Sequence, residues 1–185
     1  TCRMPFNPVE GRQFLERAFS LFGTKSDLTG ELLAWSGIVE SFTYECSDFT
    51  PLDHWISVLD RLLDRHGGFP SPEIETRVIS NIVGALTFRQ PHHPKFHEWK
   101  SRLIVLLQHI TDNQQRVMIG NFVVLHAIWV GDIAKAEWLI ELLRPPSDRD
   151  APPLSMLMWQ VLDAIYKWLI GDFHGCLAAV AKGLE

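Results

Sequence analysis

Three histidines and a glutamate lie close together in the segment QPHHPKFHEW, as His92, His93, His97 and Glu98. On a helix, His93 and His97 would share one face, and three or four such side chains could hold a zinc ion. Pro94, however, disfavours helical backbone at the residue before it. The order His-x3-His-Glu also differs from the zinc-protease motif, in which the glutamate lies between the histidines. We therefore interpret this segment as a polar loop between helices and predict no metal site.

A second group of titratable side chains follows one helical stretch and could supply acid–base pairs: Asp53, Asp60, Asp64 and His66. These residues lie opposite a stripe of leucines, so we interpret them as the solvated face of an amphipathic helix.

Two single residues, Cys176 and His126, also carry reactive groups. Cys176 has no oriented base near it in the sequence, and its surroundings favour packing over nucleophilic chemistry. His126 lies in the apolar run VMIGNFVVLHAIWV, which favours a core or groove histidine over a ligand. The phosphate-binding pattern Gly-x4-Gly-Lys-Ser/Thr does not occur. We predict no catalytic residue and no cofactor.

The composition excludes several classes of protein. The 185 residues include 17 basic and 22 acidic ones, a net charge of −5, and the basic residues form no cluster, which argues against binding nucleic acid. The three cysteines are widely spaced, as in a protein of the reducing cytoplasm without a disulfide framework. No apolar run is long enough to cross a membrane. The opening TCRMPFNP lacks an initiator methionine, so we expect a segment excised from a longer protein.

Helical periodicity dominates the chain. In TPLDHWISVLDRLLDRHGG the apolar residues recur at spacings of three and four. Thr50 and Ser71 are the expected N-caps of two helices, each with a proline at the first helical position and, for the helix after Thr50, Asp53 completing a variant capping box. Strand signals are absent. We predict nine helices, at about 8–22, 27–46, 51–66, 72–89, 95–110, 113–130, 132–144, 153–170 and 172–185.

A short pattern recurs at an offset of forty residues, in WVGDIAKAEW and LIGDFHGCLA. The glycine is expected to end one helix in the left-handed conformation, and the aspartate to cap the next. A small residue four places after the aspartate lets the paired helices approach closely. The defining residues are Gly131, Asp132 and Ala136 in the first copy, and Gly171, Asp172 and Cys176 in the second.

With weaker turns expected near residues 48 and 91, the period of about forty predicts an all-α fold. The expected architecture is a right-handed α-solenoid of antiparallel helix pairs at about 27–66, 72–110, 113–144 and 153–185, forming a single domain over 1–185 after one leading helix. The first helices of such pairs line a concave surface. The residues expected to line that groove and bind a ligand or partner are Asn121, Trp129, Trp168, Tyr44 and Phe88.

Two resemblances rest on these motifs. GDIAKA and GDFHGCLAAVAKGLE resemble the turn and second helix of a tetratricopeptide repeat (TPR), although the period is nearer 40 than 34. The run LLAWSGIVESFTYECSDFTPLDHWISVLDRLL, PSPEIETRVISNIVGALTFRQPHHP and the final repeat are similar to the helical-repeat region of bacterial MalT-like regulators, in the STAND class of signal-transduction ATPases. This resemblance implies a sensor or interaction segment of a transcriptional regulator whose ATPase lies elsewhere.

Two functions follow as expectations. The first is a non-catalytic scaffold that binds a protein partner or other domains of its own chain. The second is an effector-sensing domain of the same regulator, with a small molecule in the concave groove, which would have to bind one state more tightly than the other. An enzyme is the third class, and the lack of convergent titratable groups argues against it.

Overall fold

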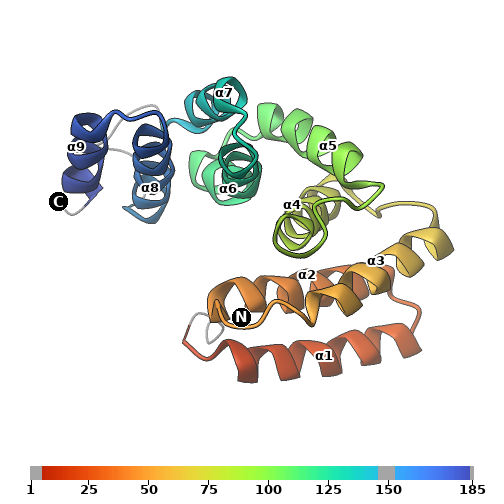
Figure 1. Ribbon diagram of the computed structural model, residues 1–185. Coiled ribbons are helices and arrows are strands. Elements are labelled where there is room, and N and C mark those ends of the chain that lie inside the picture. The colour runs from red at the N-terminus through yellow and green to blue at the C-terminus, as the bar shows by residue number, and fades with distance from the viewer. Residues whose placement is uncertain (1–5, 146–152, 184–185) are drawn as a thin grey trace. The chain divides into compact units, whose positions relative to one another are not determined.

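The computed structural model describes residues 6–145 and 153–183, and all regular secondary structure in these ranges is helical (Figure 1). Its nine helices agree with the predicted ranges to within two residues at either end. They are α1 (Pro8–Thr24), α2 (Leu28–Glu45), α3 (Leu52–His66), α4 (Pro72–Arg89), α5 (Phe96–His109), α6 (Asn113–Trp129), α7 (Ile133–Leu143), α8 (Pro153–Leu169) and α9 (Phe173–Gly183). The all-α class is confirmed.

The chain divides into two compact units, Thr1–Trp99 and Lys100–Glu185, and the boundary falls inside α5. In the first unit α1 packs on α2, while α2 also packs on α3 and α4. In the second unit α6 packs on α7 and α8, and α8 packs on α9. Consecutive helices are antiparallel neighbours, as short connections require. The right-handed solenoid stays a prediction.

The core of the first unit is built around Trp35 of α2, which is completely buried. Its indole nitrogen donates a hydrogen bond to the Trp55 carbonyl of α3 at 2.8 Å, so the polar edge of the ring is satisfied inside the core. Arg12 of α1 reaches the far end of α2, where it lies over the Phe42 ring and pairs with Glu45 at 2.6 Å. These contacts fasten α1 and α3 to the central helix α2.

The core of the second unit depends on a close approach between α6 and α7. A Cβ atom placed on Gly120 would lie 2.6 Å from the Leu143 side chain, so Leu143 would have to shift to admit any larger residue. Leu143 and Leu107 are both fully buried at this point. Trp159 of α8 then closes the core, and its indole nitrogen donates to the Ile140 carbonyl at 3.0 Å.

The two predicted caps had different outcomes. Ser71 accepts a hydrogen bond from the Ile74 amide at 3.3 Å, as expected for the N-cap of α4. The prediction that Thr50 caps α3 was wrong, because this helix begins without a side-chain cap. Its amide instead donates to the Asp48 carboxylate at 2.8 Å, so a local turn takes the place of the capping box.

No helix in the described ranges combines the length and the apolar character that crossing a membrane requires.

Candidate functional site

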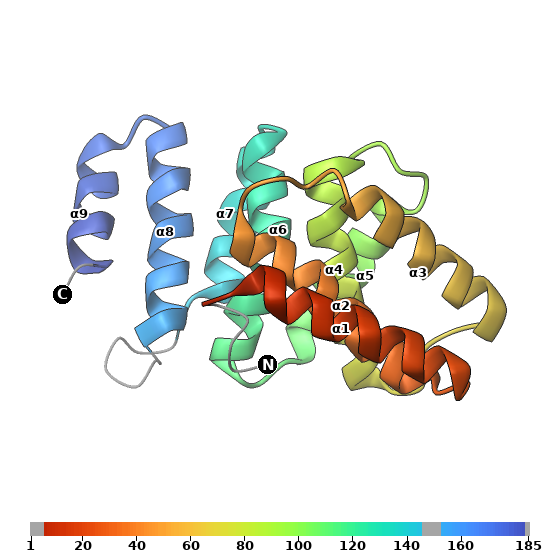
Figure 2. The ribbon, with the colours of Figure 1, turned by 90° about the horizontal axis from the view of Figure 1, so that it is seen from below.

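Two turns of the second unit, at Gly131 and at Gly171, share one backbone geometry. Both glycines are left-handed, with φ of 74° and 82°. In each turn the glycine amide donates to the carbonyl three residues earlier, at 3.1 and 3.2 Å, and the next amide donates to the carbonyl five residues earlier, at 2.9 Å. The following aspartates, Asp132 and Asp172, accept from the amides three residues on, at 3.1 and 2.9 Å. The two turns therefore lie in equivalent positions forty residues apart, at the same end of the unit (Figure 2).

A third turn of this geometry joins α1 to α2, and sequence reasoning missed it. Ser26 takes the place of the glycine with φ of 54°, and Asp27 caps α2 by accepting from the Gly30 amide at 3.0 Å. The Asp27 amide donates to the carbonyl five residues earlier at 3.1 Å. Asp27 before an apolar run is a helix-start signal in the sequence, but the Gly-Asp pattern was not recognised because Ser26 occupies the glycine position.

The small residues after the turns are placed where helices meet. Ala136 is fully buried, and Cys176 is half-buried. The turns expected near residues 48 and 91 have other geometries. Cys46 ends α2 in the left-handed conformation, while Gln90 ends α4 with φ of −137° and ψ of 62°.

The α8–α9 pair presents a row of apolar side chains to solvent, here called the α8–α9 face. Its residues are 43–62% exposed, and they are Leu157, Val161, Trp168 and Val180. The residues forty positions earlier are at most 6% exposed, and they are Val117, Asn121, Ile128 and Ile140. The helix α8 packs on both α6 and α7. The α8–α9 pair thus exposes the positions that the α6–α7 pair buries.

The residues expected to line a groove have separate environments. Asn121 is buried, and its side-chain amide donates to the Met118 carbonyl of its own helix at 2.8 Å. Trp129 and Trp168 are both exposed, at the ends of α6 and α8. Trp168 belongs to the α8–α9 face, whereas Trp129 corresponds in register to Leu169.

The other two expected groove residues, Tyr44 and Phe88, lie in the first unit. Tyr44 is exposed on α2, and its hydroxyl lies 3.3 Å from the Glu40 carboxylate as a hydrogen-bond donor. Phe88 of α4 stacks on Phe49 with ring centroids 4.5 Å apart. Both aromatic rings are therefore engaged within their own unit.

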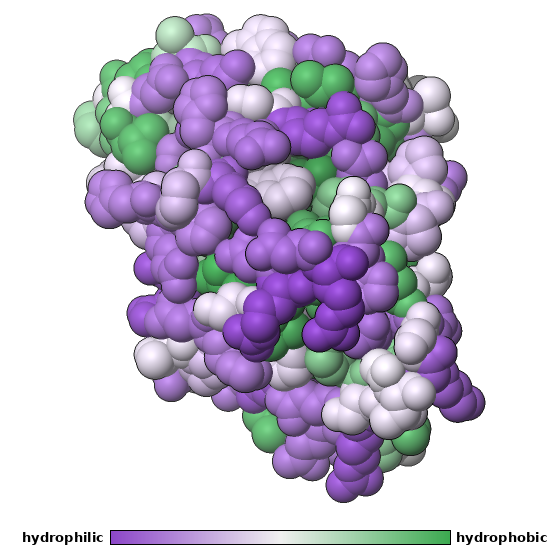
Figure 3. Space-filling view, turned by 90° about the vertical axis from the view of Figure 1, so that its right-hand side faces the viewer, coloured by the Kyte–Doolittle hydropathy of each residue, from purple (hydrophilic) through white to green (hydrophobic). Residues whose placement is uncertain are grey.

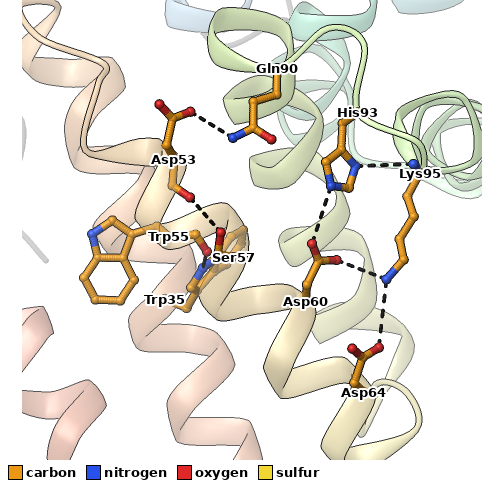
Figure 4. Close-up of polar contacts among 9 residues, drawn as sticks. All are labelled: Trp35, Asp53, Trp55, Ser57, Asp60, Asp64, Gln90, His93 and Lys95. Atoms are coloured by element: carbon orange, nitrogen blue, oxygen red, sulfur yellow. Dashed lines mark hydrogen bonds and ion pairs between the residues drawn. The ribbon is translucent and has the colours of Figure 1, made fainter.

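The acidic side of α3, expected to be solvated, binds the segment that follows α4 (Figure 4). Asp53 accepts from Arg89 at 2.5 Å and from Gln90 at 2.9 Å, which lowers the pKa of Asp53 through the Arg89 hydrogen bond first. Hydrophilic residues cover much of the face seen from the side of α3 (Figure 3). Asp53 and Asp60 on this side of the helix are half-buried, whereas Asp64 and His66 are exposed as expected.

The histidine segment is part of the same contact. The His93 ring lies 3.5 Å from the Asp60 carboxylate, and the Lys95 ammonium lies 3.1 Å from it. The hydrogen bond that Lys95 donates to the Asp60 carboxylate is the main cause of the raised pKa of Lys95. Residues 90–95 form a loop, while His97 and Glu98 are exposed in the first turn of α5. In the described ranges no three His, Cys, Asp or Glu side chains are placed to share a metal ion.

His126 is a buried residue of α6, and its Nδ1 atom lies 3.4 Å from the Lys100 ammonium. Burial lowers the pKa of His126, and the neighbouring Lys100 charge lowers it further. Burial is also the main cause of the lowered pKa of Lys100. His126 is consequently neutral at neutral pH and belongs to the core of the second unit.

Comparison with protein-family models, with curated proteins and with solved structures found no significant match.

Proposed function

We propose that this chain is a non-catalytic protein-interaction module that docks an amphipathic helix on the α8–α9 face. The observation that carries the proposal is the correspondence of that face with the buried face of the α6–α7 pair. Val117, Ile128 and Ile140 are buried in the α6–α7 pair, on which α8 packs, whereas the equivalent Leu157, Trp168 and Val180 are exposed. An apolar row on a packed helix pair is the kind of surface that binds a partner.

The internal contact indicates the chemistry of the partner. The docked side of α8 includes Ser155, Trp159, Leu162 and Tyr166, at spacings of three and four. Trp159 also donates its indole hydrogen bond to a carbonyl of α7. A partner helix for the α8–α9 face should therefore carry an aliphatic and aromatic stripe at positions i, i+3 and i+7, as Trp159, Leu162 and Tyr166 do.

The resemblance to MalT-like STAND regulators supports a setting for this module. In such a protein the docking helix belongs either to another domain of the same chain or to a separate cytoplasmic protein. Docking would then couple the repeat region to the regulator's output, provided that the two states of the regulator differ in affinity for the helix.

Isothermal titration with a peptide of residues 153–169 tests this proposal, because α8 is itself the helix that the equivalent face holds. The Val161→Asp variant should weaken peptide binding at least tenfold, since a charge in an apolar contact must be desolvated. Val105 of α5 has the same 45% exposure as Val161 but lies off the face, so Val105→Asp is the matched control and should bind normally.

Three results would contradict the proposal. The first is an absence of measurable binding to the unsubstituted chain. The second is equal weakening by Val161→Asp and Val105→Asp. The third is normal binding by the Val161→Asp variant with its circular dichroism spectrum unchanged.

A further inference from the structure

The helices α7, α8 and α9 line a half-open pocket of about 380 Å³ in the second unit. This volume is within the range of small-molecule sites, which are mostly apolar and contain a few polar groups that orient the ligand. The wall of this pocket is also mainly apolar. Its apolar side chains include Ile140, Trp159 and Ala179, which are at most 7% exposed. Such a wall favours a ligand with an apolar body.

The charged side chains around the pocket do not require a charged ligand. The described residues of the wall include three cations and three carboxylates. Arg144 and Lys167 form ion pairs with carboxylates of the same wall, and Lys182 also has a partner. Glu137 is the carboxylate outside these two pairs, and it is exposed to solvent on α7. An uncharged ligand would leave these interactions intact, whereas a charged one would have to be desolvated against the apolar wall.

One buried polar residue of the wall, Gln160 of α8, lacks hydrogen-bond partners. It is 3% exposed, and neither the nitrogen nor the oxygen of its amide has a partner among the described residues. Gly183 of α9 lies beside this amide, where a Cβ would be 2.9 Å from the oxygen, so α9 offers no side-chain partner at that position.

A buried amide without partners is costly, because it has lost its hydrogen bonds to water. Rotation about the outer torsions of Gln160 would turn its amide toward a molecule bound in the pocket. An amide group on that molecule also has a donor and an acceptor, so it would satisfy both atoms of Gln160.

A second hydrogen-bonding group of α8 lies further along the same wall. Tyr166 is 9% exposed, and its hydroxyl makes no hydrogen bond within the part of the chain that the structure describes. This hydroxyl can therefore donate to a ligand. Gln160 and Tyr166 are six residues apart, which is about 9 Å along an α-helix. The wall thus presents an amide and a hydroxyl donor on either side of mainly apolar surface.

We propose that this pocket binds an uncharged small molecule with an amide at one end and a hydrogen-bond acceptor at the other end of an apolar body roughly 9 Å long. The amide exchanges two hydrogen bonds with Gln160, the acceptor receives one from Tyr166, and the body packs on Trp159. This inference does not depend on the proposed helix docking, because the residues of the α8–α9 face do not line the pocket.

Two benzamides with a ketone on the opposite side of the ring, 4-acetylbenzamide and the longer 4-(2-oxopropyl)benzamide, test the proposal. Titration followed by nuclear magnetic resonance should give saturable shifts of the Gln160 side-chain amide and the Trp159 indole signals. The matching benzoates, in which a carboxylate replaces the amide, should bind at least about tenfold more weakly, because they lose the donor and must desolvate a charge. Equal binding of the benzoates, or no saturable shift with either benzamide, would overturn the proposal.

A pair of glutamine variants locates the effect. Gln160→Leu should weaken binding of the benzamides at least about tenfold, since it leaves their amide unpaired. This variant is also expected to be more stable than the unsubstituted chain, so unfolding would not explain its loss of binding. Gln114 is exposed on α6 and does not line the pocket, so Gln114→Leu is the matched control and should bind normally. Equal binding by the two variants would contradict the site.

Tyr166→Phe tests the other end of the ligand. It removes the hydroxyl and keeps the ring, so it should weaken binding of the ketone-bearing benzamides by about threefold or more. Benzamide itself has no acceptor at that end and should bind Tyr166→Phe and the unsubstituted chain equally. Equal weakening of both kinds of ligand, or of neither, would contradict the assigned orientation.

Discussion

If the turns at Ser26 and Gly131 share one backbone geometry, Ser26→Gly and Gly131→Ala should change the free energy of unfolding in opposite directions. Both residues are left-handed, with φ of 54° and 74°. An L-residue in this conformation costs roughly 1–2 kcal/mol. A glycine removes that cost but loses about 0.5–1 kcal/mol more backbone entropy on folding. Ser26→Gly should therefore stabilise the chain by about 0.5 kcal/mol.

Gly131→Ala should have the opposite effect, a loss of about 0.5 kcal/mol, from the same two contributions. A Cβ at Gly131 meets no atom within 4 Å, so the loss is conformational and not steric. Urea unfolding followed by circular dichroism measures both changes. Ser26→Ala is the control, since it removes the hydroxyl and keeps the strain, and it should give no gain. Destabilisation by Ser26→Gly, or an unchanged midpoint for Gly131→Ala, would refute the shared geometry.

Three other predictions concern the second unit. Gly120→Ala should cost about 1–3 kcal/mol in urea unfolding, because its Cβ would lie 2.6 Å from Leu143; an unchanged midpoint would show that the helices can separate freely. Gln160→Leu should raise stability by about 1 kcal/mol, because it removes an unsatisfied buried amide, and a loss of that size would mean that the amide has a partner. Because the pKa of His126 is lowered in the native state, stability should be at its full value above the unfolded pKa near 6.5 and should fall as the pH drops below it, since the unfolded chain then binds the proton more readily. His126→Gln should flatten this part of the pH profile, and an identical slope in both proteins would contradict the assignment.

The helix bounds were predictable because their signals are local. Apolar spacing and N-caps such as Ser71 act within one or two turns of the chain. The turn at Ser26 was not predicted because serine is not a residue type that indicates a left-handed backbone. The prediction for Thr50 was wrong because its amide donates a hydrogen bond to Asp48, two residues earlier, and forms a local turn in place of a cap.

The candidate sites were less predictable because they depend on distant partners. Asp53 accepts hydrogen bonds from Arg89 and Gln90, which are more than thirty residues away in the sequence. The pattern of its own helix therefore predicted only a solvent-exposed side chain. Asn121 was expected to line an open groove, but it is only 6% exposed in the α6–α7 pair, on which α8 packs.

The most direct test of the proposed docking surface is chemical-shift mapping by nuclear magnetic resonance during titration with the α8 peptide. The expected result is a set of perturbed amides centred on Leu157, Val161, Trp168 and Val180. Perturbation centred on Val117 and Ile128 would show that the peptide displaces α8 from its own site. That result, or an unchanged spectrum, would contradict the account of the α8–α9 face as an open docking surface.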